Sequence, residues 1–141
     1  MLCIFDHQTT CIKPMNYLLL TSALLTLVAF FVHTFVGDKE YQQIKPSSTS
    51  SQPFRFWWQH RCGWHMVSFD LLAFGGLLLY SSFYDFEGKS LLLTLVSIYF
   101  FGYAGFWLIT LLVSKVSLQI YGQLGQWVLL LLIGLLTFFS R

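Results

Sequence analysis

Four apolar runs, each long enough or nearly long enough to cross a bilayer, constrain this chain more than any other feature. They cover about residues 17–36, 64–84, 91–113 and 119–139. A helix needs about 20 apolar residues to span the hydrocarbon core. All three prolines fall outside the runs, at positions 14, 46 and 53. Each run can therefore form an unbroken helix, which is what a lipid environment requires.

Composition supports a membrane protein. Hydrophobic residues make up 56% of the 141 residues and charged residues only 10%, whereas soluble domains are about 25% charged. We therefore predict an all-α fold, a single domain over residues 1–141 that forms an antiparallel bundle of four transmembrane helices in a lipid bilayer. The net charge is only +2 and the basic residues are scattered, so nucleic acid is not expected as a partner.

The connections between the runs differ in length. Residues 85–89 and 114–117 form short polar links, which make antiparallel neighbours of the helices that they join. Residues 37–63 form a predicted long loop between the first and second helices. Within it, residues 45–52 are polar and read as flexible. Residues 54–61 are rich in aromatic and basic side chains, which suits an interfacial helix leading into the second span.

Charge counting predicts the orientation. The termini and the link at 85–89 share one side of the membrane and carry three basic residues: Lys13, Lys89 and Arg141. The long loop and the link at 114–117 carry the other five: Lys39, Lys45, Arg55, Arg61 and Lys115. The positive-inside rule then places the long loop in the cytoplasm and both termini outside. We expect a multi-pass protein of a bacterial inner membrane.

The N-terminal region allows two further expectations. The first apolar run is too long for a cleaved signal and has neither a basic cluster before it nor an A-x-A site after it, so a retained helix is expected. Met15 directly precedes this run, and we hypothesise that translation starts there; the intact mass of the natively expressed protein tests this. The three cysteines form no C-x-x-C pair, so a zinc site or disulfide framework is not predicted from them.

Ionisable residues gather near the predicted long loop. Asp70 lies inside the second run, where a carboxylate costs about 2.5–3.5 kcal/mol on insertion scales and marks a functional site by default. His33 ends the first run and His65 opens the second, so a hairpin brings both imidazoles to a similar depth. Arg61 precedes His65 by four residues and shares its helix face. The candidate ligand-binding residues are His33, Arg61, His65, Asp70 and Glu40.

Helix geometry limits how these residues combine. Asp38 and Glu40 follow His33 within two turns. Asp70 lies five residues beyond His65, which places it about 140° around the helix and about 7.5 Å deeper. Both side chains therefore cannot point straight at the first helix. They face different neighbours or meet through water.

Several chemistries remain open for this site. Two histidines with a carboxylate suit zinc, iron or copper, which makes His33 and His65 candidate metal ligands, although no H-x-x-x-H or H-E-x-x-H spacing is present. Haem ligation, a proton path and a small or anionic ligand are alternatives. No catalytic triad or phosphate loop is legible, so no reaction is predicted. The chain could instead be an accessory subunit that packs against a membrane protein partner or against a second copy of itself.

The second pair of helices carries polar and aromatic stripes. Tyr99, Tyr103 and Trp107 are spaced i, i+4, i+8, and Gly102 and Gly105 lie on another side, where backbones could approach closely. A glutamine stripe opens the fourth run: Gln119, Gln123 and Gln126. Hydrogen bonds between helices are the simplest role for such stripes. A substrate path is the alternative.

One motif resembles a pattern in small bacterial four-helix membrane proteins of unknown function. In those proteins a histidine near the end of helix one precedes a glycine and an acidic residue, and a Trp-His pair opens helix two. The matching positions here are His33, Gly37, Glu40, Trp64 and His65. The resemblance implies a four-span layout and no particular activity. Small multidrug transporters have a similar length, but their membrane carboxylate is a glutamate in helix one, and the first run here has none.

Overall fold

Helices account for almost all of the described chain. The computed structural model describes residues 15–49, 51–114 and 125–141. The elements in chain order are α1 Tyr17–Phe31, the π-helical segment η1 Val32–Gly37, α2 Asp38–Gln43, α3 Gln52–Phe83, α4 Lys89–Val113 and α6 Gln126–Phe139. α1, η1 and α2 follow one another without a break, so the described residues form four helical rods and no strand.

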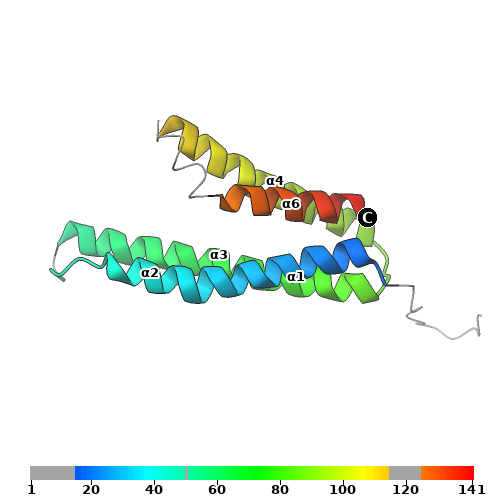
Figure 1. Cartoon of the computed structure of the whole chain (residues 1–141), viewed down its shortest axis with the longest axis horizontal. Coiled ribbons are helices and arrows are strands. Elements are labelled where there is room, and N and C mark those ends of the chain that lie inside the picture. The colour runs from blue at the N-terminus through cyan, green and yellow to red at the C-terminus, as the bar shows by residue number, and fades with distance from the viewer. Residues whose placement is uncertain (1–14, 50, 115–124) are drawn as a thin grey trace, which may run out of the picture.

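The rods form two antiparallel hairpins (Figure 1). The continuous α1–η1–α2 rod packs along α3, α4 packs along α6, and α6 also packs on α1. The hairpins lie together at the end that holds the C-terminus, and α4 diverges from α3 toward its own C-terminal end (Figure 1). α3 and α4 therefore share only a small contact.

Three of the rods are long and apolar enough to cross a membrane: residues 17–43, 52–83 and 89–113. The chain is therefore a multi-pass membrane protein with an all-α fold. The described part of the fourth rod, α6, has 14 residues. The predicted fourth span begins at residue 119, and residues 115–124, with Gln119 and Gln123, lie outside the described residues.

The prediction of a long loop over residues 37–63 is wrong. α2 continues to Gln43 and α3 begins at Gln52, so only residues 44–51 link the two rods. Ser51 caps α3, because its Oγ accepts a hydrogen bond from the Phe54 N–H, and Pro53 occupies the first turn, where no N–H is needed. The interfacial helix expected at residues 54–61 is the first part of α3. Hydropathy locates the end of an apolar run and not the end of a helix. The prediction failed because these helices continue into polar sequence.

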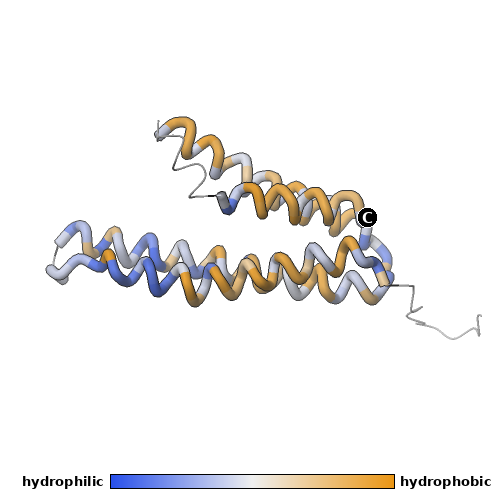
Figure 2. The backbone as a smooth tube through the Cα atoms, viewed as in Figure 1, coloured by the Kyte–Doolittle hydropathy of each residue, from blue (hydrophilic) through white to orange (hydrophobic). Residues whose placement is uncertain are grey.

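The first two rods are longer than a bilayer core. At 1.5 Å per residue they measure about 40 and 48 Å, against a hydrocarbon thickness of about 30 Å. Figure 2 shows hydrophilic residues concentrated at the end formed by α2 and the start of α3, with apolar residues along the middle of both hairpins. This polar end, defined as residues 38–63, projects beyond the apolar part of the bundle.

The opposite end is held together by polar bonds between helices. Asn16 caps α1 through Oδ1, which accepts from the Leu19 N–H at 3.1 Å, and its Nδ2 donates to the Ser140 carbonyl at 2.9 Å. Deeper in the bundle, the buried hydroxyls of Ser22 and Thr137 lie 2.7 Å apart. These bonds join α1 to α6, and they explain why the hairpins meet at this end.

Two adjacent glycines in α3 provide a matched test of helix packing. A Cβ on Gly75 would lie 2.7 Å from Cδ2 of Leu27 in α1, whereas a Cβ on Gly76 would meet no described atom within 4 Å. We expect Gly75→Ala to lower the free energy of unfolding by about 1–3 kcal/mol through overpacking. Gly76→Ala should leave it unchanged or raise it by about 0.5–1 kcal/mol, because alanine favours the helix.

Denaturant titration of the two purified variants in the same detergent measures this difference. Equal stability of the two variants would contradict the close approach of α1 and α3 at Gly75.

Candidate functional site

An ion-pair cluster centred on Asp38 joins α2 to α3 at the base of the polar end. Arg61 donates from Nε to Oδ1 at 2.8 Å and from Nη2 to Oδ2 at 2.9 Å, which is a bidentate pair. Gln42 donates to Oδ2 at 2.6 Å, and Nε2 of His65 lies 3.3 Å from Oδ1. The Asp38 side chain is only 12% exposed. Each of its oxygens therefore has at least two polar neighbours, as a buried carboxylate needs.

An aromatic ladder, defined as His33, Trp64, Tyr41 and Trp57, lies beside this cluster. The rings of His33 and Trp64 stack with centroids 4.0 Å apart and planes 10° apart. Tyr41 follows at 6.1 Å from Trp64 and 5.7 Å from Trp57. The indole N–H of Trp57 donates to the Tyr41 carbonyl at 3.3 Å. The ladder alternates between the first rod and α3, so it holds the two helices in register.

The π-helical segment η1 contributes two features to the ladder. The carbonyl of His33 accepts a hydrogen bond from the Trp64 indole N–H at 3.0 Å. A Cβ on Gly37 would overlap the Trp64 ring, so glycine is the residue that admits the indole here. Short π-helical turns within α-helices are frequent at functional sites. His33 also bonds through Nδ1 to the Ser68 hydroxyl at 3.1 Å.

A second polar centre lies on another face of α3, deeper in the apolar region. Oδ2 of Asp70 accepts hydrogen bonds from the hydroxyls of Tyr99 and Tyr103 at 2.6 and 2.7 Å. The two phenol oxygens lie 2.7 Å from each other. Trp107, the third member of the predicted stripe on α4, donates no hydrogen bond to a described residue. This triad, Asp70 with Tyr99 and Tyr103, is the main polar contact between α3 and α4.

An open depression of about 480 Å³ extends along α3 from His65, beside the Asp38 cluster, to Asp70. It is lined by Cys62, His65, Met66, Phe69 and Asp70. His65 thus contacts Asp38 and also borders the depression, and Asp70 borders it about 1.4 turns farther along α3. The site is consequently a mainly apolar hollow with an imidazole near its outer end and a carboxylate near its inner end.

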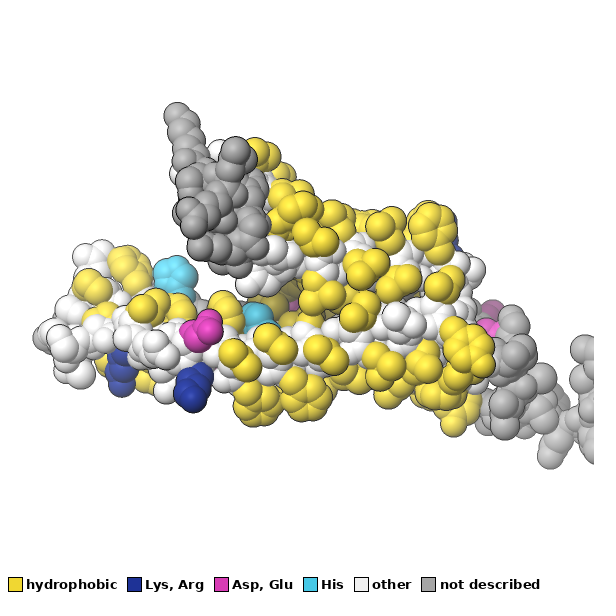
Figure 3. Space-filling view, in the orientation of Figure 1, with side chains coloured by type: hydrophobic (Ala, Val, Ile, Leu, Met, Phe, Trp, Pro, Cys, Tyr) yellow, Lys and Arg dark blue, Asp and Glu magenta, His cyan; other side chains and the backbone are white. Residues whose placement is uncertain are grey.

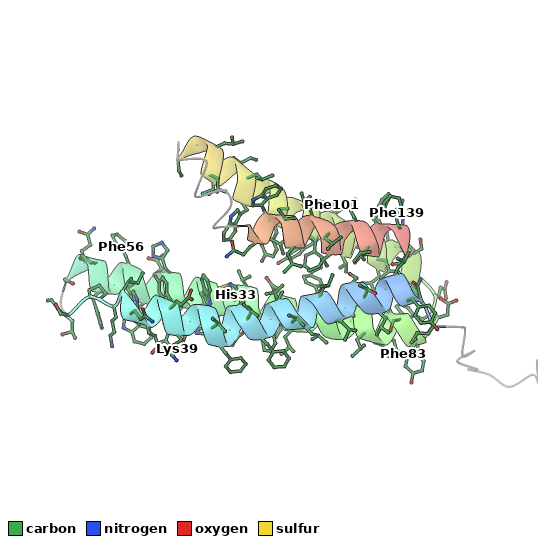
Figure 4. All side chains as sticks on the ribbon, viewed as in Figure 1. His33, Lys39, Phe56, Phe83, Phe101 and Phe139 are labelled. Carbon is green, nitrogen blue, oxygen red and sulfur yellow. The ribbon has the colours of Figure 1, made fainter. Side chains whose placement is uncertain are left out.

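The structure brings together part of the predicted site. His33, Arg61 and His65 lie along the hairpin interface, the last two directly on Asp38. Asp70 faces α4 instead, as the 140° offset from His65 requires. Figure 4 shows Lys39 at the polar end and His33 farther along the same rod. Glu40 is exposed and forms no hydrogen bond or ion pair with a described residue, so it does not join the cluster.

Sequence reasoning did not include Asp38 among the candidate site residues, although it included Glu40. Both acids follow His33 within two turns, and the resemblance favoured Glu40. Helical spacing carries the missing information, because Asp38 and Gln42 are four residues apart on one face and Arg61 and His65 are four apart on the facing helix. Two such pairs at the meeting point of a hairpin predict an interhelical cluster once the helices are extended.

The described residues contain no cluster of side chains that could hold a metal ion. Among residues 15–49, 51–114 and 125–141, no three His, Cys, Asp or Glu side chains are close enough to hold an ion. Nδ1 of His33 is engaged by Ser68 and Nε2 of His65 by Asp38. Metal binding by His33 and His65 remains a prediction from the sequence.

Comparison with known proteins finds no match to this chain in any protein family, any curated protein or any solved structure. The function must therefore be inferred from the geometry of the site. Figure 3 shows the contrast on which that inference depends, with hydrophobic side chains over the middle of the molecule and histidine, basic and acidic side chains toward the polar end.

The ion pair at the polar end predicts unequal effects for two arginines of α3. Arg61→Ala should lower the melting temperature, because it removes the bidentate partner of a largely buried carboxylate. Arg55→Ala changes an exposed side chain on the same helix and should leave the melting temperature nearly unchanged. Circular dichroism melts of both variants in detergent measure the difference, and a fully tolerated Arg61→Ala would show that Asp38 does not depend on it.

Proposed function

We propose that this protein binds a small ligand from within or beside a bacterial inner membrane, in the depression between His65 and Asp70. The observation that carries the proposal is the placement of Asp70, an acid inside a membrane-crossing helix that borders an open hollow. Ionisable residues at such depth are costly and mark binding sites or ion paths by default. The Asp38 cluster and the aromatic ladder support the site by fixing α3 against the first rod.

The bonding of Asp70 favours a ligand site over a purely structural role. A packing carboxylate would have both oxygens engaged by neighbouring helices. Here both phenol hydrogen bonds fall on Oδ2, and Oδ1 receives no hydrogen bond from a described residue. The residue is half-buried and lines the hollow. One carboxylate oxygen therefore remains for a ligand.

Labelling with dicyclohexylcarbodiimide tests this proposal. The reagent is apolar and modifies carboxyl groups that it can reach from the membrane. We expect peptide mass spectrometry to find the adduct on Asp70 in the purified, lipid-reconstituted protein, with no adduct at that position in Asp70→Asn. Labelling of Glu40 or other exposed acids with an unmodified Asp70 would show a closed packing group and would overturn the proposed function.

A second candidate function is an accessory subunit of a membrane complex. It is favoured by one observation on α4: a Cβ on Gly102 or Gly105 would meet no described atom within 4 Å. Glycines on an open helix face allow a second helix to approach closely. Purification under mild detergent would then give a fixed partner or a dimer, and bulky substitutions at Gly105 would disrupt it while leaving Asp70 labelling intact.

A further inference from the structure

We infer that the ligand of the Asp70 depression is an amphiphilic amine or organic cation, an apolar body that carries one positive group. This inference deepens the proposed function and depends on it. It follows from the size, charge and apolar lining of the hollow, taken in turn.

The size of the hollow suits a small organic molecule. Its volume of about 480 Å³ lies within the range of about 300–1,000 Å³ that small-molecule sites occupy. A bare inorganic ion would leave most of this space empty. The lining residues that the structure describes all come from α3, so the ligand would lie along that helix.

The charge of the lining selects for a cation. Among the described residues, Asp70 is the only acid in the lining, and no described lysine or arginine lines the hollow. An ionised carboxylate only accepts hydrogen bonds, and in an apolar site it is stable when paired with a cation or donor. Tyr99 and Tyr103 donate to Oδ2 but carry no charge. A protonated amine that donates to Oδ1 would give both oxygens of Asp70 a donor and would neutralise its charge. A carboxylate or phosphate ligand would be repelled.

The apolar side chains supply the rest of the complementarity. Met66 and Phe69 are 70% and 69% exposed, so their side chains form an open apolar surface beside Asp70. An aromatic face attracts a desolvated cation, and a methionine thioether adapts to irregular apolar groups. Both residues are reached from the bilayer, where amphiphilic amines concentrate. His65 at the outer end is held by Asp38 and does not compete for the acid.

Cys62 provides a reporter, because it lines the hollow and is an exposed free thiol. In a Cys3→Ser/Cys11→Ser background it is the only cysteine of the chain. The rate of its alkylation by N-ethylmaleimide can be followed in lipid nanodiscs that contain the full-length protein. Three probes with the same alkyl chain isolate the effect of charge: dodecyldimethylamine, dodecanol and dodecanoate.

At a concentration of about nine times its dissociation constant, which gives roughly 90% occupancy, we expect dodecyldimethylamine to slow alkylation of Cys62 about tenfold. Dodecanol and dodecanoate should have no such effect, and Asp70→Asn should remove the effect of the amine. The Asn variant also controls for partitioning of the amine into lipid, because its membrane is identical.

The outcomes separate the two proposals. Equal protection by the amine and the alcohol, or protection by dodecanoate, would overturn the cationic ligand while leaving a ligand site. Absence of protection by all three probes, with Asp70 still labelled by the carbodiimide, would overturn the inferred class of ligand alone. Absence of both protection and carbodiimide labelling would overturn the site itself.

Discussion

Replacing Asp70 by asparagine is expected to weaken amine binding strongly while the helices stay folded. Asparagine keeps the shape of the side chain and one carbonyl oxygen, which can still accept the hydrogen bonds of Tyr99 and Tyr103. It has no negative charge, so the electrostatic attraction for a cation is lost. Equilibrium binding of dodecyldimethylamine should therefore weaken by at least about tenfold, equivalent to ~1.4 kcal/mol, with an unchanged circular dichroism spectrum.

The Asp70→Leu variant separates binding from the contact between the hairpins. Leucine removes the acceptor of both phenol hydrogen bonds, each worth about 0.6–2 kcal/mol between membrane helices. Leu72 on α3 and Phe106 on α4 are exposed positions that can carry spin labels. We expect the distribution of distances between the two labels to broaden in Asp70→Leu but not in Asp70→Asn. Full amine binding by either variant would show that the acid is not the anchor.

Replacing Trp64 by alanine is expected to destabilise the protein more than any other single change in the aromatic ladder. The indole stacks on His33, packs against Gly37 and donates to the His33 carbonyl. Its loss leaves a cavity between η1 and α3 and one carbonyl without its donor. We expect the free energy of unfolding to fall by about 3 kcal/mol, the lower end of the range for large aromatic truncations, as measured by denaturant titration.

Two variants serve as controls for this prediction. Trp64→Phe keeps an aromatic ring but has no N–H, so a loss of about 1 kcal/mol is expected from the missing hydrogen bond. Trp58→Ala removes an indole of the same helix that is 42% exposed, and its effect should be much smaller. If Trp58→Ala and Trp64→Ala cost the same, the aromatic ladder does not hold the first rod against α3.

The fold was largely predictable because lipid imposes simple rules on a chain. Apolar length and the position of prolines correctly predicted helices near 17–36, 64–84 and 91–113. The helix ends were less predictable, since a helix that leaves the membrane can continue in polar sequence if tertiary contacts support it. The Asp38 cluster and the aromatic ladder are those contacts, and they extend the first rod to Gln43 and begin α3 at Gln52.

The site was predictable in part. Periodicity correctly placed His65 and Asp70 on different faces of one helix, and antiparallel pairing placed His33 beside the start of the second span. The carboxylate that accompanies His65 is Asp38 rather than Asp70, because the identity of the partner depends on helix rotation and on the π-helical turn at residues 32–37. Hydropathy does not report either property, and spacing predicts the cluster only once the extended helix ends are known. The spacing of Tyr99 and Tyr103 places two phenol donors on one face of a helix, which is a pattern that can hydrogen-bond a carboxylate within the membrane.

A double-mutant cycle tests the central claim most directly, namely that Asp70 turns toward α4 and is held there by two phenols. The cycle combines Asp70→Leu with the paired change Tyr99→Phe/Tyr103→Phe and compares free energies of unfolding in the same bilayer or detergent. We predict a coupling of about 1–2 kcal/mol, because either change alone already breaks both hydrogen bonds. Strictly additive effects would show that the acid and the phenols do not interact and would contradict the placement of the site.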